Sequence, residues 1–329
     1  MKFTEKYIKL YEEISQESLD KWGYSYPPKT WDQLFAWDTK SFEKYLKDKK
    51  DDNKKTKSYV SLLKSINDFG FYIAFQKRDY QFLNNVIYQT SRQIIISRSI
   101  LASGTDHCNV LFNALNSFSC NDFEIIDSFF PKNLPQSKGT YYTEVSVNLL
   151  KILYYKQFDL KNEAIKKADK FLVKKNTAWE KHIILYFKAL INKNEIDASN
   201  CLVELCKAYQ KMKHSVSKRH NMLAKCFASE IHGLYRFAKI IDEDLFRKIT
   251  RPNHNCFSEE FELWQKKNDF PKGKLFYEYP EKLDYMNKIL EAKLPTVALH
   301  NPYPKKKMLY KDTDKFLTDL TENATKLMH

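Results

Sequence analysis

Cysteine and histidine are the residues of this sequence best suited to holding a metal or attacking a substrate, and four of them lie between positions 201 and 220. Cys201 and Cys206 are five residues apart and are followed by His214 and His220. Two metal ligands on one helix are usually three or four residues apart, because only then do both side chains face the same ion. We therefore interpret the cysteines as buried thiols and the histidines as exposed imidazoles, and we expect no metal and no cofactor.

A second group of reactive residues is the run Asp106, His107 and Cys108. Adjacent residues on a helix point about 100° apart, so this run does not bring a thiol and an imidazole together. Catalytic pairs of this type are neighbours in space, and the sequence does not identify such neighbours. The chain also lacks a Walker loop, a GxGxxG fingerprint, a GxSxG elbow and an HExxH motif. We therefore expect that the protein is not an enzyme.

The most distinctive charged segment is 205–229, which contains six basic residues and no acidic one. Its centre, MKHSVSKRH, is predicted to be an exposed turn between two helices. Such a surface suits an acidic partner, although a solvated face in a lysine-rich protein gives the same pattern. On the first interpretation, the partner-binding residues of this segment are Lys207, Lys211, Lys213, Lys218 and Arg219.

A second candidate surface follows Pro252, where proline and aromatic residues replace the helical pattern. The segments PKGKLFYEYP and LPTVALHNPYPKKKMLY are predicted to lie extended over a helical body, held by their aromatic side chains. Aromatic residues contribute much of the binding energy at protein interfaces. Phe276, Tyr277 and Tyr279 are therefore added to the candidate partner-binding residues.

Composition narrows the class of partner. The 329 residues carry a formal net charge of +14, but seven of the 55 basic residues are arginines. Arginine is favoured where bases and phosphates are recognised, so nucleic-acid binding is not our main expectation. The six cysteines form no CxxC pair, which indicates free thiols in a reducing compartment. No apolar run reaches the length of a membrane span and no signal-peptide pattern opens the chain, so we expect a cytoplasmic protein without a membrane partner.

Helical periodicity dominates the elements that carry these residues. In 179–212, an apolar helix face is followed by the turn INKNE and by a second amphipathic helix. The same hairpin is predicted at 59–94 around FQKRD and at 141–172 around YKQFD. The acids Asp159 and Glu195 are 36 residues apart, near the period of tetratricopeptide (TPR) repeats. We predict an all-α fold built as an irregular, TPR-like array of antiparallel helical hairpins, with an ordinary helical bundle as the alternative.

Changes in composition along the chain predict three parts. Residues 1–50 form an N-terminal helical extension that is interrupted by Pro27 and Pro28. Residues 51–251 form the hairpin array. Residues 252–329 supply further helices and an extended aromatic, proline-rich and basic C-terminal segment. We expect these parts to pack together as one unit.

Four segments follow one another between residues 60 and 213, and they carry a family resemblance. They are FQKRDYQFL with the long helix before it, FNALNSFSCNDFEIIDSFFP, LKILYYKQFDLKNEAIKKADKFL and ALINKNEIDASNCLVELCKAYQK. In their order and in the character of their turns they resemble the immunity protein 49 family of bacterial polymorphic toxin systems. The resemblance covers about half of the chain, and no functional residues carry over with it. It implies an all-helical protein that binds and neutralises a cognate toxin without a cofactor.

We therefore expect an immunity protein that neutralises a cognate bacterial toxin by direct protein–protein contact, without catalysis. Like charges repel across an interface, so the contacted toxin surface is expected to be acidic. Two alternatives remain. The first is a TPR-like scaffold or adaptor that binds a peptide or protein, and the second is a basic nucleic-acid-binding protein.

Overall fold

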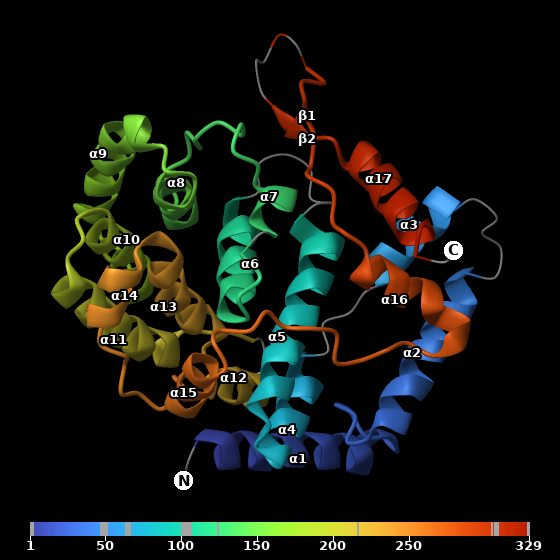
Figure 1. Ribbon diagram of the computed structural model, residues 1–329. Helices are drawn as coiled ribbons and strands as arrows, with labels where there is room; N and C mark the ends of the chain where they lie inside the picture. The colour runs from blue at the N-terminus through green and yellow to red at the C-terminus, as the bar shows by residue number, and fades with distance from the viewer. Residues whose placement is uncertain are drawn as a thin grey trace. The chain divides into compact units, whose positions relative to one another are not determined.

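The computed structural model describes residues 3–46, 52–62, 67–99, 107–123, 125–215, 217–303, 305 and 309–327. These residues are predominantly helical (Figure 1). Their two strands, β1 (Leu299–His300) and β2 (Tyr310–Lys311), are two residues long and pair antiparallel. The prediction of an all-α protein is therefore confirmed. Among these residues, no helix has both the length and the apolar composition needed to cross a bilayer.

Two compact units make up the chain, each assembled from segments that are distant in sequence. The first unit comprises Met1–Gly104, Glu124–Pro131 and Lys272–His329, and the second comprises Thr105–Phe123 and Lys132–Pro271. This division differs from the predicted boundaries at residues 50 and 251. Most of the C-terminal part joins the N-terminal helices in one unit, whereas the expected hairpin array is divided between the two units.

Helix α5 joins the N-terminal helices of the first unit to its C-terminal segment. Its helices are α1 (Phe3–Trp22), α2 (Trp31–Leu46), α3 (Asp52–Leu62), α4 (Asn67–Lys77), α5 (Tyr80–Ile94), α7 (Ile126–Phe129), α16 (Asp284–Glu291) and α17 (Thr313–Thr325), with a π-helical turn η1 (Ile95–Ser99) and a 3-10 turn η3 (Glu281–Leu283). The Gln89 side-chain amide donates to the carbonyl of Tyr277 at 2.8 Å. Its oxygen accepts from the backbone N–H groups of Phe276 and Tyr277 at 2.8 and 2.9 Å. Gln89 thus fixes a segment without regular structure to α5, which explains why residues 272–329 belong with the N-terminal helices.

Helix α13 lies at the centre of the second unit, beside α6 (Figure 1). The helices of this unit are α6 (His107–Ser119), α8 (Tyr142–Tyr155), α9 (Lys161–Leu172), α10 (Ala178–Ile191), α11 (Glu195–Lys211), α12 (Lys218–Ala224), α13 (Ser229–Ile241), α14 (Glu243–Lys248) and α15 (Glu259–Lys267), with a 3-10 turn η2 (Phe158–Leu160). A Cβ atom at Gly233 would lie 1.8 Å from the carbonyl oxygen of Leu115, so glycine is required for this close approach of α13 to α6. Phe237 stacks on Phe118 with ring centroids 5.1 Å apart. These contacts fix the helix that supplies much of the candidate site.

Helix pairs lie at the three predicted hairpin turns, as α4–α5, α8–α9 and α10–α11, and the turns share one backbone geometry. The first pair begins at Asn67 and not at the predicted residue 59, which lies on α3. Arg78, Lys156 and Lys193 follow the first helix of each pair with φ of 53°, 54° and 53°. The next N–H group bonds back five residues, as in a Schellman C-cap. The donors and acceptors are Asp79 and Ala74 (3.0 Å), Gln157 and Ile152 (3.1 Å), and Asn194 and Ala189 (2.9 Å). Each turn therefore holds a non-glycine residue in the left-handed region.

Replacing one of these residues with glycine should stabilise the protein. A left-handed backbone costs a residue with a Cβ atom about 1 kcal/mol, whereas glycine adopts it freely. Lys156 is exposed, with φ of 54°. The greater conformational entropy of glycine in the unfolded chain cancels part of this gain. For Lys156→Gly we therefore expect the free energy of unfolding, measured by urea denaturation, to rise by about 0.5 kcal/mol.

Lys156→Ala is the matched control, because alanine removes the same side chain and keeps the Cβ atom. It should bring no gain. A gain with alanine equal to that with glycine would mean that the lysine side chain, and not backbone strain, is the source of the effect.

Candidate functional site: a basic pocket in the second unit

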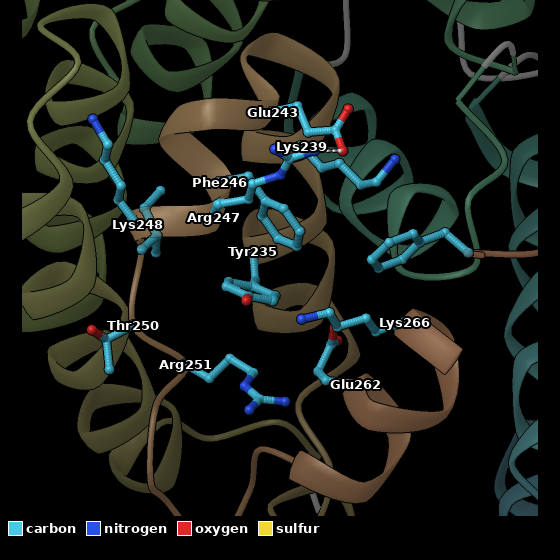
Figure 2. A pocket seen from close by; sticks show the side chains of 12 residues that line it. Tyr235, Lys239, Glu243, Phe246, Arg247, Lys248, Thr250, Arg251, Glu262 and Lys266 are labelled. Atoms are coloured by element: carbon cyan, nitrogen blue, oxygen red, sulfur yellow. Dashed lines mark hydrogen bonds and ion pairs between the residues drawn. The ribbon is translucent and has the colours of Figure 1, made fainter. Parts of the chain in front are cut away.

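A pocket of about 590 Å³ opens in the second unit among α13, α14 and α15 (Figure 2). This volume is within the range of small-ligand sites. Tyr235, Phe246 and Phe270 give it aromatic walls, and the backbone segment 249–251 after α14 completes its rim. The side chains thus come from three helices and from the segments that follow α14 and α15.

Charge is the pocket's main property. Five basic and two acidic side chains line it, which gives the lining a net charge of +3. They are Lys239, Arg247, Lys248, Arg251 and Lys266, with Glu243 and Glu262. Both acids are already paired with arginine, Glu243 with Arg247 at 3.0 Å and Glu262 with Arg236 at 2.5 Å. In the part of the chain that the structure describes, Lys239 and Lys266 have no carboxylate within ion-pair distance. The pocket therefore attracts anions.

Three hydrogen-bond donors face the middle of the pocket. Figure 2 shows Arg251 and Lys266 extending from opposite sides toward the space beneath the Tyr235 ring. Arg251 also lies 3.4 Å from Glu259, which holds its guanidinium at the rim. Burial, and then the charge of Glu262, raise the pKa of Tyr235 to about 12. The phenol therefore stays protonated at neutral pH and can donate to an anion together with Arg251 and Lys266.

A buried charge network lies behind the pocket. Glu262 is 2% exposed and joins two residues of α13 that are fully buried, His232 and Arg236. Its Oε2 accepts from Arg236 Nη2 at 2.5 Å, and its Oε1 lies 2.7 Å from His232 Nδ1. The backbone N–H of Ser258 donates to His232 Nε2 at 3.1 Å. Because Nε2 accepts, the proton of a neutral imidazole lies on Nδ1 and is donated to Glu262.

The network keeps Glu262 ionised inside the protein. Burial alone raises the pKa of a carboxyl group, but the Arg236 charge and the His232 hydrogen bond outweigh burial and hold the pKa of Glu262 below its usual value. The network therefore contains one buried anion matched by one buried cation, and it joins α15 to α13.

Arg236 keeps two hydrogen-bond donors that Glu262 does not use. Its Nε and Nη1 atoms are buried and have no acceptor among the described residues. The centre of its guanidinium lies 4.5 Å from the ring centroid of Phe270, which lines the pocket. These two donors add positive potential behind the wall formed by Phe270.

The five predicted basic contact residues lie elsewhere in this unit, on α11, on α12 and on the connection between them. Four are exposed, namely Lys207, Lys211, Lys213 and Lys218, and Arg219 is half-buried. Lys207 pairs with Glu204 at 2.6 Å. The segment therefore presents lysines to solvent as expected, and none of the five lines the pocket.

The aromatic part of the predicted contact surface needs correction. Tyr277 and Tyr279 are 2% and 4% exposed, and Phe276 is half-buried. Tyr277 stacks on Trp31 with centroids 5.6 Å apart, and Tyr279 packs edge-on against Phe42 at 5.9 Å. These tyrosines are core residues of the first unit, because the extended segment is buried against its own helices rather than displayed.

Sequence spacing also missed a cluster of thiols and imidazole. Cys206, His254 and Cys256 offer Sγ and ring-nitrogen atoms that all lie within 4.8 Å of one another. The hydrogen bonds from Cys206 and His254 lower the pKa of Cys256 below its usual value, against the effect of burial. The same bond raises the pKa of the Cys206 thiol. Cys201 is buried outside this cluster, and the side chains of the run 106–108 lie outside the described residues.

The pocket leaves no run of like charges in the sequence, because acids and bases alternate along its segments. The stretch 239–266 is not free of acids, since it contains Glu243 and Glu262. One signal was present: three of the chain's seven arginines, Arg236, Arg247 and Arg251, fall within this short region. Clustering of a rare charged residue type was therefore the better indicator here.

Comparison of the chain with protein-family models, with curated proteins and with solved structures finds no match.

Removing the buried charge of Glu262 should strongly destabilise the protein. Glu262→Gln keeps the shape and an acceptor but leaves the Arg236 cation buried without its counter-charge, which typically costs about 3 kcal/mol. The free energy of unfolding is measured by urea denaturation. The control on the same helix is Glu259→Gln, which removes an exposed partner of Arg251 and should cost about 0.5 kcal/mol or less. Equal losses in the two variants would contradict the role given to the buried network.

The contribution of Glu262 should also depend on pH. Its pKa in the folded state is below the unfolded value of about 4.3. The unfolded chain therefore binds the proton first, so the stabilisation is fully present above that value and is lost as pH falls through the lower folded pKa. The difference in unfolding free energy between the wild type and Glu262→Gln should shrink at acid pH. A difference that stays constant into that range would contradict an ionised Glu262.

Proposed function

We propose that this protein is an immunity protein that binds a cognate bacterial toxin directly and neutralises it, and that the pocket of the second unit receives an acidic group of the toxin. The observation that carries the proposal is the basic lining of the pocket, whose two acids are already paired. The resemblance of residues 60–213 to the immunity protein 49 family supplies the partner class.

The charge distribution supports an acidic contact surface on the toxin. The chain carries +14 overall, and its exposed lysines at 207–218 add to the potential of the pocket. A field of this sign accelerates the approach of an acidic partner and slows that of a basic one. A carboxylate that enters the pocket would meet Arg251, Lys266 and the Tyr235 hydroxyl, and these donors pair with an oxyanion through charge-assisted hydrogen bonds.

Neutralisation by contact requires a firm surface more than a reactive one. The helical hairpins of the second unit, α8–α9 and α10–α11, which we regard as TPR-like, provide it, and the buried Glu262 network fixes α15 against α13 beside the pocket. Occlusion of the toxin's working surface then follows from binding alone. The protein needs no cofactor for this role.

The test is the association of the purified protein with the toxin encoded next to its gene, at low and at moderate salt. Reversing Lys211, Lys213, Lys218 and Arg219 to glutamate should lower the association rate by about tenfold or more at low salt, and the loss should shrink as salt screens the field. Arg251→Glu with Lys266→Glu should mainly raise the dissociation rate, because these two side chains contact the partner.

The matched control is Lys166→Glu with Lys170→Glu. Both lysines are exposed on α9 in the same unit, and the pair changes the net charge by as much as the pocket pair does. This control should leave the dissociation rate unchanged. An equal effect of control and pocket pairs would reject the pocket as the contact site. Binding to a random DNA duplex as tight as to the toxin would favour the nucleic-acid alternative.

A further inference from the structure

Two cysteines and one histidine from different parts of the second unit meet inside the protein. Cys206 lies on α11 and is fully buried, as is Cys256, which follows α14 in the chain. His254 lies two residues before Cys256 and is half-buried. Its Nδ1 atom is 3.3 Å from Cys256 Sγ, and the Cys206 sulfur completes a group whose ligand atoms all lie within 4.8 Å.

The backbone holds this group in place. The carbonyl of Cys256 accepts from Ala228 N–H at 2.9 Å, and that of His254 accepts from Phe257 N–H at 3.0 Å, so the segment 254–257 forms a tight turn fixed to the start of α13. Cys206 is set by α11, whose N-cap Asn194 accepts from Asp197 N–H at 3.0 Å. The three donor atoms are therefore brought together by elements ordered for other reasons.

The 3.3 Å between Cys256 Sγ and His254 Nδ1 is close to the separation of sulfur and nitrogen ligands around a tetrahedral zinc ion, and the Cys206 sulfur lies within 4.8 Å of both. With Zn–S bonds of about 2.3 Å and Zn–N bonds of about 2.0 Å, ligand atoms lie about 3.5 to 3.8 Å apart. Zinc binds thiolate and imidazole ligands readily, whereas magnesium and calcium prefer oxygen ligands. A set of two cysteines and one histidine leaves a fourth position for a water molecule or another ligand.

We propose that Cys206, His254 and Cys256 form a zinc site in the second unit, which ties α11 to the segment between α14 and α15. Binding of Zn²⁺ forms two Zn–S bonds and one Zn–N bond and releases two protons to solvent from the thiol and imidazole groups. No electron is transferred. Two thiolates and one Zn²⁺ sum to zero charge, so the loaded site fits a buried position.

The ion would constrain the region that carries the pocket. The bridge closes a loop of about fifty residues from Cys206 to Cys256 that contains α12, α13 and α14, and closing a loop of that size lowers the entropy of the unfolded chain. This proposal does not depend on the toxin, and its test needs no partner.

The experiment titrates the reduced, metal-free full-length chain with Co²⁺, which replaces Zn²⁺ in such sites and reports thiolate ligands by a charge-transfer absorption band. We expect one Co²⁺ per chain with that band, and its loss on addition of Zn²⁺. Cys256→Ser and Cys206→Ser should each lose most of the band. Cys201→Ser, a buried thiol on the same helix as Cys206 but outside the cluster, should keep it.

A second measurement protects the test against variants that fail to fold. Zn²⁺ should raise the melting temperature of the wild type and of Cys201→Ser, and a chelator should reverse the rise, because the ion binds the folded state. His254→Ala should show a smaller rise. A wild type without the thiolate band, or without any rise in melting temperature with Zn²⁺, would overturn the proposal. So would a Cys201→Ser variant that loses the band as fully as Cys256→Ser does.

Discussion

The second unit depends on one buried anion. Glu262 is the point at which α15 is joined to α13, through a guanidinium on one oxygen and an imidazole on the other. A carboxylate at this depth is tolerated because each of its oxygens is matched by a fixed donor. Because it fixes α15, the same arrangement also sets the position of Lys266, one turn further along that helix. It leaves the Nε and Nη1 donors of Arg236 unused, next to the ring of Phe270. Stability and electrostatics of the pocket thus have a common origin.

Local patterns in the sequence predicted local structure well. The hairpin turns FQKRD, YKQFD and INKNE were correctly placed, because helical periodicity and polar turn residues act over a few positions. Asp79 caps its helix by accepting from Phe82 N–H at 2.9 Å, whereas the cap at the third turn is Asn194 and Glu195 occupies the first helical turn. Local chemistry therefore predicted the turns, with the exact capping residue differing by one position.

Long-range pairing escaped prediction for a physical reason. Gln89 bonds residues 276 and 277, and Cys206 meets Cys256, yet neither pairing leaves a periodic trace in the sequence. The aromatic C-terminal segment looked like an exposed contact surface because its composition suits interfaces and cores equally well. Whether such a segment is exposed or buried depends here on the side-chain amide of Gln89, almost two hundred residues earlier on α5, which both donates to and accepts from its backbone.

The hydrogen bonds of Gln89 also have a consequence for the order in which a growing chain acquires its structure. Every segment of the second unit has been synthesised once residue 271 leaves the ribosome, whereas the first unit still lacks residues 272–329. Domains generally fold as units during synthesis. The first unit therefore becomes complete after the second one, although it contains the start of the chain. Until residues 276 and 277 have been synthesised, the face of α5 that receives Tyr277 has no covering segment, and Gln89 lacks the backbone groups that it binds in the folded protein.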